Sequence, residues 1–206
     1  KSLHGFEFFG GLSKGVEKRA KVRSRMIASA LKELVIESEN VVIMGHKMAD
    51  FDCLGAASGL LKIISSVSKP VHICVDREKN LSKELIAQLI SGGYDNKLIS
   101  PKQALDTVNQ DTLLIIVDTH NPEFVECPEL LELAGNIVVI DHHRKMVNHN
   151  DGAVIFYHEP NASSTCEMVT ELAEYFNAGA SISRLEAEAL LSGIMLDTKN
   201  FVVRTG

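Results

Sequence analysis

Aspartate and histidine residues recur in four short clusters, and each cluster falls at the predicted end of a strand or helix. The clusters are His46 with Asp50 and Asp52, then Asp118, then Asp141 with His142 and His143, and last Asp197. Carboxylate and imidazole groups together are typical ligands of divalent metal ions. A pair of such ions can promote phosphoester cleavage without a covalent nucleophile. The clusters therefore indicate metal-assisted hydrolysis of a phosphoester.

Each of these residues, taken singly, also has a purely structural explanation. Asp50 and Asp52 could cap a helix or form a turn, and Asp118 could be a turn residue. A single histidine after a strand more often lies in the core or at its rim. Two adjacent histidines that directly follow an aspartate are harder to explain in that way. A joint site is favoured because all the clusters lie at element ends that can converge.

The hydrophobic pattern alternates between strands and helices, which predicts an α/β fold with a mostly parallel sheet and helices on both faces. Strands are expected at 41–44, 71–75, 112–117 and 137–140, with an edge strand at 154–157. Helices are expected at 14–38, 52 or 53–67, 81–91, 128–134, 163–177 and 183–196. The last two helices begin with capping-box patterns, Ser164 with Glu167 and Ser183 with Glu186.

The predicted sheet would bring three of the clusters to one edge. In open α/β sheets, ligands bind beyond the carboxyl ends of the strands. His46 follows the first strand, Asp118 ends the strand at 112–117, and Asp141 begins the cluster that ends the strand at 137–140. Asp197 would follow the last helix, where the helix dipole disfavours a carboxylate unless a cation is bound.

Charge in the clusters favours two metal ions. Asp50, Asp52, Asp118 and Asp197 together carry four negative charges, which would repel a phosphodiester and raise their own pKa values. Two divalent ions would cancel that charge. Mixed carboxylate and imidazole ligands suit Mn(II) better than Mg(II) or structural zinc. We therefore expect two divalent metal ions, with Mn(II) favoured.

Two further segments could contact phosphate. Arg144 and Lys145 directly follow the histidines, and an arginine guanidinium is suited to bidentate phosphate contact. Exposed loop charges are an equally good explanation of this pair. The helix start at 163–165 could bind an anion through its backbone amides, although simple capping explains it as well.

Composition excludes several classes of protein. The chain has 206 residues and a net charge of −6, which argues against a broad grip on duplex nucleic acid. It contains no apolar run long enough to span a membrane. The four cysteines are widely spaced and form no CxxC pair, which indicates buried free thiols in a reducing compartment. P-loop and GxGxxG motifs are absent.

The clusters resemble the motifs of the DHH phosphoesterase superfamily. The resemblance lies in residues 45–56, Asp118, residues 141–144 and residues 193–198. Further stretches resemble the cyclic di-AMP phosphodiesterases of the GdpP/YybT type, namely 16–19, 22–25, 159–165 and 201–206. Many relatives have Asn-Pro where this chain has Met48-Ala49, but those positions carry no expected ligand.

The resemblance implies the two metal sites. One Mn(II) would be held by His46, Asp50 and Asp118. The second would be held by Asp52, Asp118, His142 and Asp197, with Asp118 bridging the pair.

The resemblance also implies the catalytic groups. Asp141 would orient His142, since metal-bound histidines usually need such a partner. His143 would face the phosphate, and Arg144 would assist. A hydroxide activated by the two metals would open cyclic di-AMP to linear diadenylate. Two alternatives are a DHH oligoribonuclease or 3′-phosphoadenosine phosphatase, and a non-catalytic nucleotide-binding module.

The family's domain organisation sets expectations for the rest of the protein. Residues 1–13 would be the tail of an upstream degenerate GGDEF domain or a linker, and residues 14–206 the DHH catalytic domain. A smaller C-terminal domain that grips the nucleotide would lie outside this chain, so low activity is expected. The full-length protein would be anchored in the cell membrane with this domain on the cytoplasmic side. A homodimer would form through regions outside this chain.

Overall fold

A single sheet of six parallel strands forms the centre of the computed structural model, which describes residues 10–144, 152–177 and 181–202, with side chains from residue 21 onward. The strands are β1 (Asn40–Met44), β2 (Val71–Cys74), β3 (Leu98–Ile99), β4 (Thr112–Val117), β5 (Asn136–Asp141) and β6 (Ile155–His158). Their spatial order is β3-β2-β1-β4-β5-β6, and every neighbouring pair is parallel. The mostly parallel sheet expected from the sequence is confirmed.

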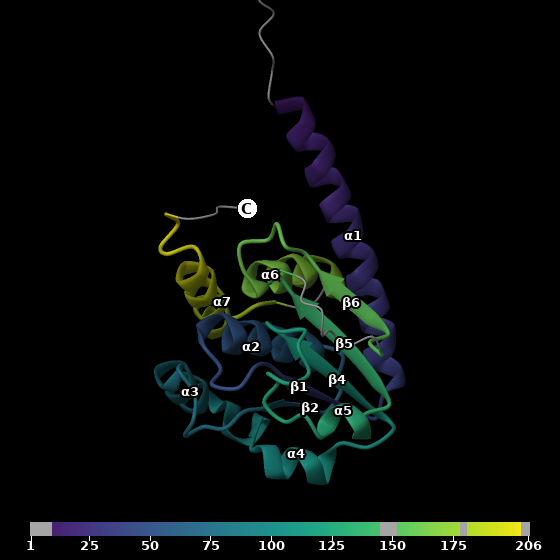
Figure 1. The fold of residues 1–206 in the computed structure, drawn as a ribbon, viewed down its shortest axis with the longest axis vertical. Helices are drawn as coiled ribbons and strands as arrows, with labels where there is room; N and C mark the ends of the chain where they lie inside the picture. The colour runs from purple at the N-terminus through teal and green to yellow at the C-terminus, as the bar shows by residue number, and fades with distance from the viewer. Residues whose placement is uncertain (1–9, 145–151, 178–180, 203–206) are drawn as a thin grey trace, which may run out of the picture.

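Helices cover both faces of the sheet. They are α1 (Gly10–Glu37), α2 (Phe51–Ser65), α3 (Lys83–Leu89), α4 (Pro101–Thr107), α5 (Leu130–Leu133), α6 (Thr165–Phe176) and α7 (Arg184–Asp197). A π-helical turn (Ile90–Tyr94) and a 3-10 turn (Asp95–Lys97) follow α3. Helices α1, α2, α3, α6 and α7 pack on one face, and α4 and α5 pack on the other (Figure 1).

The continuous apolar runs of the strands follow from burial on both faces. In β1, Val41 and Ile43 belong to the larger core under α1, α2 and α6. Val42 and Met44 belong to the smaller core under α4 and α5. All four side chains are fully buried, so alternation of polar and apolar residues is not needed in this strand.

Helix α2 packs very closely against α7, and glycines make this approach possible. A Cβ atom built on Gly55 would lie 2.6 Å from the backbone oxygen of Ala189 in α7. A Cβ atom on Gly193 would lie 2.8 Å from Cα of Asp52 in α2. The first turn of α2 therefore lies directly against α7, which brings Asp52 toward the end of α7 that carries Asp197.

The sequence patterns missed part of the smaller layer and misplaced several ends. Strand β3 and helix α4 were not expected, although Ser100 and Gln103 form a reciprocal capping box at the start of α4. Helix α5 is shorter than the expected 128–134, and α1 begins at Gly10, before the expected residue 14. The proposed upstream tail at 1–13 thus overlaps α1, and its first nine residues lie outside the described residues.

The two predicted capping boxes have different outcomes. Glu186 accepts hydrogen bonds from the backbone N–H and hydroxyl of Ser183, as predicted. At α6, Ser164 accepts from the backbone N–H of Glu167, but the Glu167 carboxylate turns to the backbone N–H of Ser163. At the start of α6, the glutamate side chain therefore bonds one residue before the N-cap, to Ser163 instead of Ser164.

Two expectations drawn from composition can be compared with the structure. All four cysteines are buried free thiols, as their spacing indicated. Among the helices in the described ranges, none combines the length and apolar character needed to cross a membrane.

The close contact of α2 with α7 yields a stability prediction. We expect Gly55→Ala to lower the free energy of unfolding by about 1–3 kcal/mol, because the new methyl group would meet a backbone oxygen that cannot move alone. This range is the net loss, after subtraction of the gain in helix propensity of about 1 kcal/mol that alanine brings over glycine. Urea unfolding monitored by circular dichroism measures the difference.

Gly59→Ala is the matched control on the same helix. Its new methyl group would meet Leu190 Cδ2 at 2.9 Å and Val169 Cγ1 at 3.0 Å, which are side-chain ends that can shift. We expect a smaller loss at Gly59. A Gly55→Ala variant as stable as the original chain would show that α2 and α7 do not approach this closely.

Candidate metal centre

The carboxyl ends of β1 and β4 create a crevice at the centre of the sheet. The chain leaves β1 toward β2 on one side, whereas β4 leads to β5 on the other, so the strand order reverses between these two neighbours. Such a reversal is where open α/β sheets bind ligands. His46 lies just after β1, Asp118 lies just after β4, and Asp141 is the last residue of β5.

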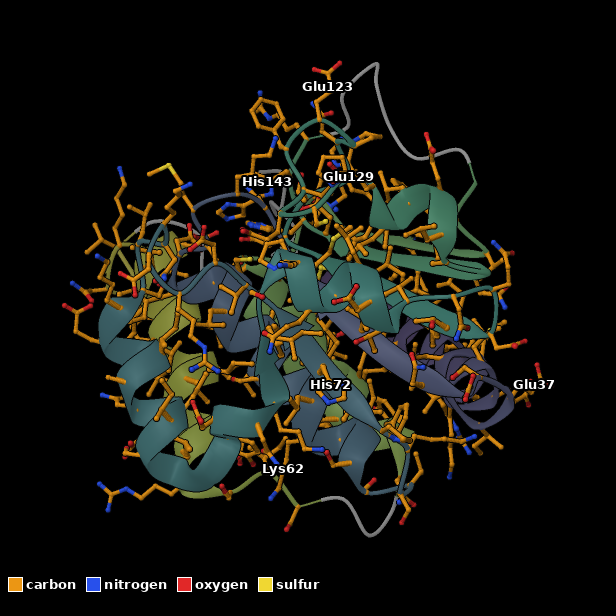
Figure 2. The ribbon with its side chains drawn as sticks, turned by 90° about the horizontal axis from the view of Figure 1, so that it is seen from below. Glu37, Lys62, His72, Glu123, Glu129 and His143 are labelled. Atoms are coloured by element: carbon orange, nitrogen blue, oxygen red, sulfur yellow. The ribbon has the colours of Figure 1, made fainter. Side chains whose placement is uncertain are left out.

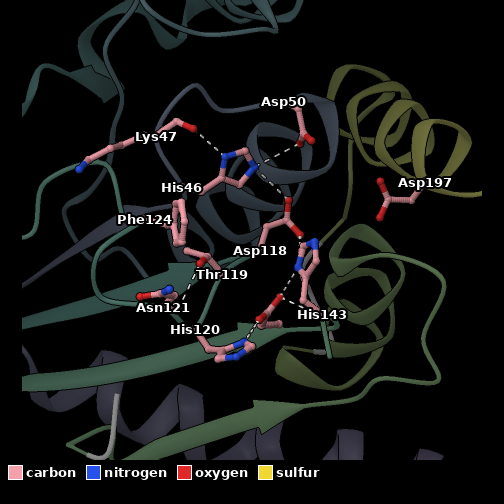
Figure 3. Close-up of a pocket in the computed structure, with 11 residues that line it drawn as sticks. His46, Lys47, Asp50, Asp118, Thr119, His120, Asn121, Phe124, His143 and Asp197 are labelled. Atoms are coloured by element: carbon pink, nitrogen blue, oxygen red, sulfur yellow. Dashed lines mark hydrogen bonds and ion pairs between the residues drawn. The ribbon is translucent and has the colours of Figure 1, made fainter. Parts of the chain in front are cut away.

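The first group of side chains surrounds the imidazole of His46. Its Nε2 atom lies 3.6 Å from Asp50 Oδ1 and 3.4 Å from Asp118 Oδ2, while its Nδ1 atom lies 2.8 Å from the backbone oxygen of Lys47 (Figure 3). The Cys53 thiol is also close to His46 and Asp118. One imidazole nitrogen thus faces two carboxylates, which is an arrangement that can hold a cation.

The second group surrounds the imidazole of His142. Its Nε2 atom lies 2.9 Å from Asp197 Oδ2, 3.6 Å from Asp52 Oδ2 and 3.7 Å from Asp118 Oδ1. Asp118 therefore faces both groups, one through each carboxylate oxygen. The structure brings together all six residues that the sequence singled out as metal ligands.

A buried imidazole nitrogen supports the fit of a metal ion to the second group. The His142 Nε2 atom is buried and makes no hydrogen bond of acceptable geometry, although Asp197 is within ion-pair distance. Buried polar atoms are rarely left without a partner. Coordination of a cation would satisfy this nitrogen and the carboxylate oxygens around it.

Protonation in the absence of cations reflects crowding of like charges. Burial and the nearby Asp118 and Asp197 raise the pKa of Asp52. Burial alone would lower the pKa of His46, but its contacts with Asp118 and Asp50 raise it to about 11. A cation would take the place of the His46 proton and relieve the repulsion among the carboxylates, so its binding releases protons.

The start of α6 positions the two most buried carboxylates. The backbone N–H groups of Thr165 and Cys166 donate to the two oxygens of Asp52, at 2.7 Å and 2.9 Å. The Thr165 hydroxyl donates to Asp118 Oδ1 at 2.9 Å. The sequence suggested that the backbone amides at 163–165 could bind an anion, and the anionic group that the Thr165 amide binds is the Asp52 carboxylate of the same chain. Apart from the position of Thr165 at a helix start, nothing in the sequence indicated that it would contact a proposed metal ligand.

Asp141 has partners other than the one implied by family resemblance. Its Oδ1 atom accepts from His143 Nδ1 at 2.8 Å, and its Oδ2 atom contacts His120 Nδ1. It was expected to orient His142. Burial would raise its pKa, but the hydrogen bonds from His143 and His120 lower it to about 2. Asp141 thus stays ionised and fixes the ring of His143.

His143 is placed between this buried carboxylate and solvent. Its side chain is 54% exposed, and its hydrogen bond to Asp141 raises its pKa to about 9. Arg144 is exposed immediately after it, and Lys145 lies outside the described residues. His143 therefore offers a protonated imidazole at neutral pH.

A pocket of about 350 Å³ opens over these groups (Figure 3). It contains site residues that were expected from the sequence together with five that were not: Lys47, Thr119, His120, Asn121 and Phe124. Four of the five lie on the loop after β4, which is irregular and gives no periodic signal in the sequence. Only the fold reveals that His120 contacts Asp141.

Residues 40–194 match the family described as "DHH family, N-terminal domain". The chain belongs to the DHH family. This DHH domain is 46% identical over 203 residues to the cyclic-di-AMP phosphodiesterase GdpP of Geobacillus thermodenitrificans, and 40% identical over 204 residues to the cyclic-di-AMP phosphodiesterase PdeA of Listeria monocytogenes. Each match covers 97% of this chain and 31% of the relative, so the chain spans about a third of their length.

The fold is shared with solved structures. An exopolyphosphatase-related protein from Bacteroides fragilis superposes with a TM-score of 0.67 over 84% of this chain and 50% of its own, at 20% sequence identity. Identity at this level establishes the common α/β fold alone.

The hydroxyl of Thr165 leads to a prediction about metal binding. We expect Thr165→Val to weaken Mn(II) binding about 10- to 100-fold, because Asp118 loses a hydrogen bond that fixes its carboxylate. Thr165→Ser keeps the hydroxyl and should bind Mn(II) nearly as well as the original chain. Isothermal titration calorimetry measures all three affinities.

Thr170→Val provides the control on the same helix. Thr170 is exposed, and its hydroxyl donates only to the backbone oxygen of Cys166 within α6. Its Mn(II) affinity should be unchanged. Equal losses in the Thr165→Val and Thr165→Ser variants would show that the hydroxyl does not position Asp118.

Proposed function

We propose that this DHH domain is the catalytic part of a metal-dependent phosphodiesterase that opens cyclic di-AMP to linear diadenylate. The observation that carries the proposal is the pair of ligand groups that share Asp118 at the reversal point of the sheet. The names of the two relatives, which match almost the whole chain, favour cyclic di-AMP as the substrate.

Six side chains would hold two divalent ions. His46, Asp50 and Asp118 would hold one, and Asp52, Asp118, His142 and Asp197 the other. Bound there, the ions would activate a water molecule and neutralise phosphate charge. We favour Mn(II), because the donors are both imidazole and carboxylate groups.

His143 is the group that we assign to the phosphate. Asp141 holds its Nδ1 atom and keeps the ring protonated, so the other ring nitrogen can donate to a phosphate oxygen or to the leaving oxygen. Arg144, exposed beside it, can contact a phosphate oxygen through its planar guanidinium. In this assignment Asp141 does not touch the substrate and acts by positioning His143.

The remaining functions that we propose belong to parts of the protein outside this chain. The matched relatives are about three times longer than this chain. We propose that the additional length includes a domain that grips the nucleotide, a membrane anchor and a dimer contact. The domain described here would lie on the cytoplasmic side of that anchor. Binding energy from remote parts of a substrate contributes to catalysis. We therefore propose that this domain alone hydrolyses its substrate slowly and that a chain extended at its C-terminus does so faster.

Hydrolysis and metal content measured together test the proposal. We expect Mn-dependent conversion of cyclic di-AMP to linear diadenylate, and we expect Asp118→Ala to lower the rate at least about 100-fold and to reduce bound Mn(II), because both ligand groups lose a member. The chain and a C-terminally extended chain are compared by chromatography of the products.

Asp106→Ala is the matched control, because Asp106 is an exposed aspartate on α4 in the other layer. It should leave hydrolysis and metal content unchanged. Short linear RNA and 3′-phosphoadenosine serve as competing substrates. Faster hydrolysis of either one would replace cyclic di-AMP with that substrate, and hydrolysis that survives Asp118→Ala would contradict the metal mechanism.

A further inference from the structure

Phe124 presents an exposed aromatic ring at the rim of the catalytic pocket. Its side chain is 54% exposed, and it lines the same pocket as His46, Asp118 and His143. Among the described residues that line this pocket, it is the one with a wholly apolar aromatic ring. Figure 3 shows the ring beside His46. An apolar ring in this otherwise polar pocket gains free energy if a flat apolar surface covers it.

The loop that carries Phe124 is held in a defined position relative to His46. The backbone oxygen of Phe124 accepts from the backbone N–H of Lys47 at 2.7 Å, and Val125 forms a β-bridge with His46. The backbone N–H of Phe124 donates to the oxygen of Asn121 at 3.1 Å. The backbone at Phe124 is therefore held next to the first group of ligands before any ligand arrives, so binding orders little additional main chain.

The surroundings of the ring suit a molecule that is anionic at one end and flat at the other. The Lys47 ammonium group donates to the backbone oxygen of Glu123 at 3.2 Å, which ties a positive charge to the same loop. In Figure 2, Glu123 and His143 lie at the same end of the molecule, and Lys62 lies at the opposite end. The imidazole of His143 lines the same pocket, and its Nδ1 atom lies 3.7 Å from Asp118 Oδ1.

We propose that Phe124 is a stacking platform for a nucleobase whose phosphate lies at His143 and the metal ligands. This inference rests on the proposed function, because it places the base of a phosphodiester substrate in the same pocket. Stacking on an aromatic side chain tolerates any base but gains most from the larger purines, since it scales with the covered surface. The ring thus favours nucleotides over phosphoesters that have no base.

Two ligands that differ only in the base provide the test. AMP and ribose 5-phosphate are titrated into the Mn(II)-loaded chain and into its Phe124→Ala variant by calorimetry. We expect Phe124→Ala to weaken AMP binding about 5- to 100-fold and to leave ribose 5-phosphate unchanged. Phe124→Tyr retains the ring and should bind AMP like the original chain.

Leu105→Ala is the control for loss of an exposed apolar side chain, because Leu105 is 39% exposed on α4, away from the pocket. It should change neither affinity. Unchanged AMP binding in Phe124→Ala, or equal weakening of both ligands, would overturn the platform and leave the phosphodiesterase proposal standing. Failure of the original chain to bind AMP would also overturn the platform, whereas the phosphodiesterase proposal is tested separately by the hydrolysis and metal content of the original chain and its Asp118→Ala variant.

Discussion

Repulsion among buried carboxylates is the constraint on which the rest of the site depends. Asp118 and Asp52 are buried within a few ångströms of the same imidazole, and Asp197 completes the group. Without cations this arrangement is costly, because like charges and burial both oppose ionisation. The fold tolerates it through backbone donors and imidazole partners. The proposed pair of divalent ions is the simplest way to make such a site favourable.

The local backbone shows how much of the structure serves these carboxylates. Asp118 has a positive φ of 61°, a conformation that is uncommon outside glycine and often marks functional positions. Its backbone N–H donates to the Ile140 oxygen of β5, which holds this turn at the end of β4. Asp50 caps α2 through the N–H groups of Asp52 and Cys53, whereas Asp52 accepts hydrogen bonds from the first two N–H groups of α6. One short segment thus links two helix starts to the proposed centre.

Much of this arrangement could be predicted from sequence, for a physical reason. Buried parallel strands are continuous apolar runs, and residues that directly follow them must lie at the same edge of the sheet. That reasoning placed His46, Asp118 and Asp141 together. It also treated helix capping and metal binding as competing explanations for Asp50, although the structure shows Asp50 capping α2 while it lies beside His46.

Contacts between distant segments could not be predicted in the same way. Thr165 and Asp118 are far apart in the chain, and only the packing of α6 reveals their hydrogen bond. His120 and Phe124 lie on an irregular loop, where no periodic pattern indicates which side chains face the pocket. Helix α4 is a different case. Ser100, Pro101 and Gln103 form a recognisable helix start, but a helix of seven residues is too short to show a helical pattern of apolar residues.

Anomalous diffraction at the manganese absorption edge, from crystals of this chain grown with Mn(II), tests the central claim most directly. The account predicts two peaks about 3.5–4 Å apart, one beside His46 and Asp50 and the other beside His142 and Asp197, with the Asp118 carboxylate in contact with both. A single peak, or peaks that do not touch Asp118, would contradict a shared two-metal centre.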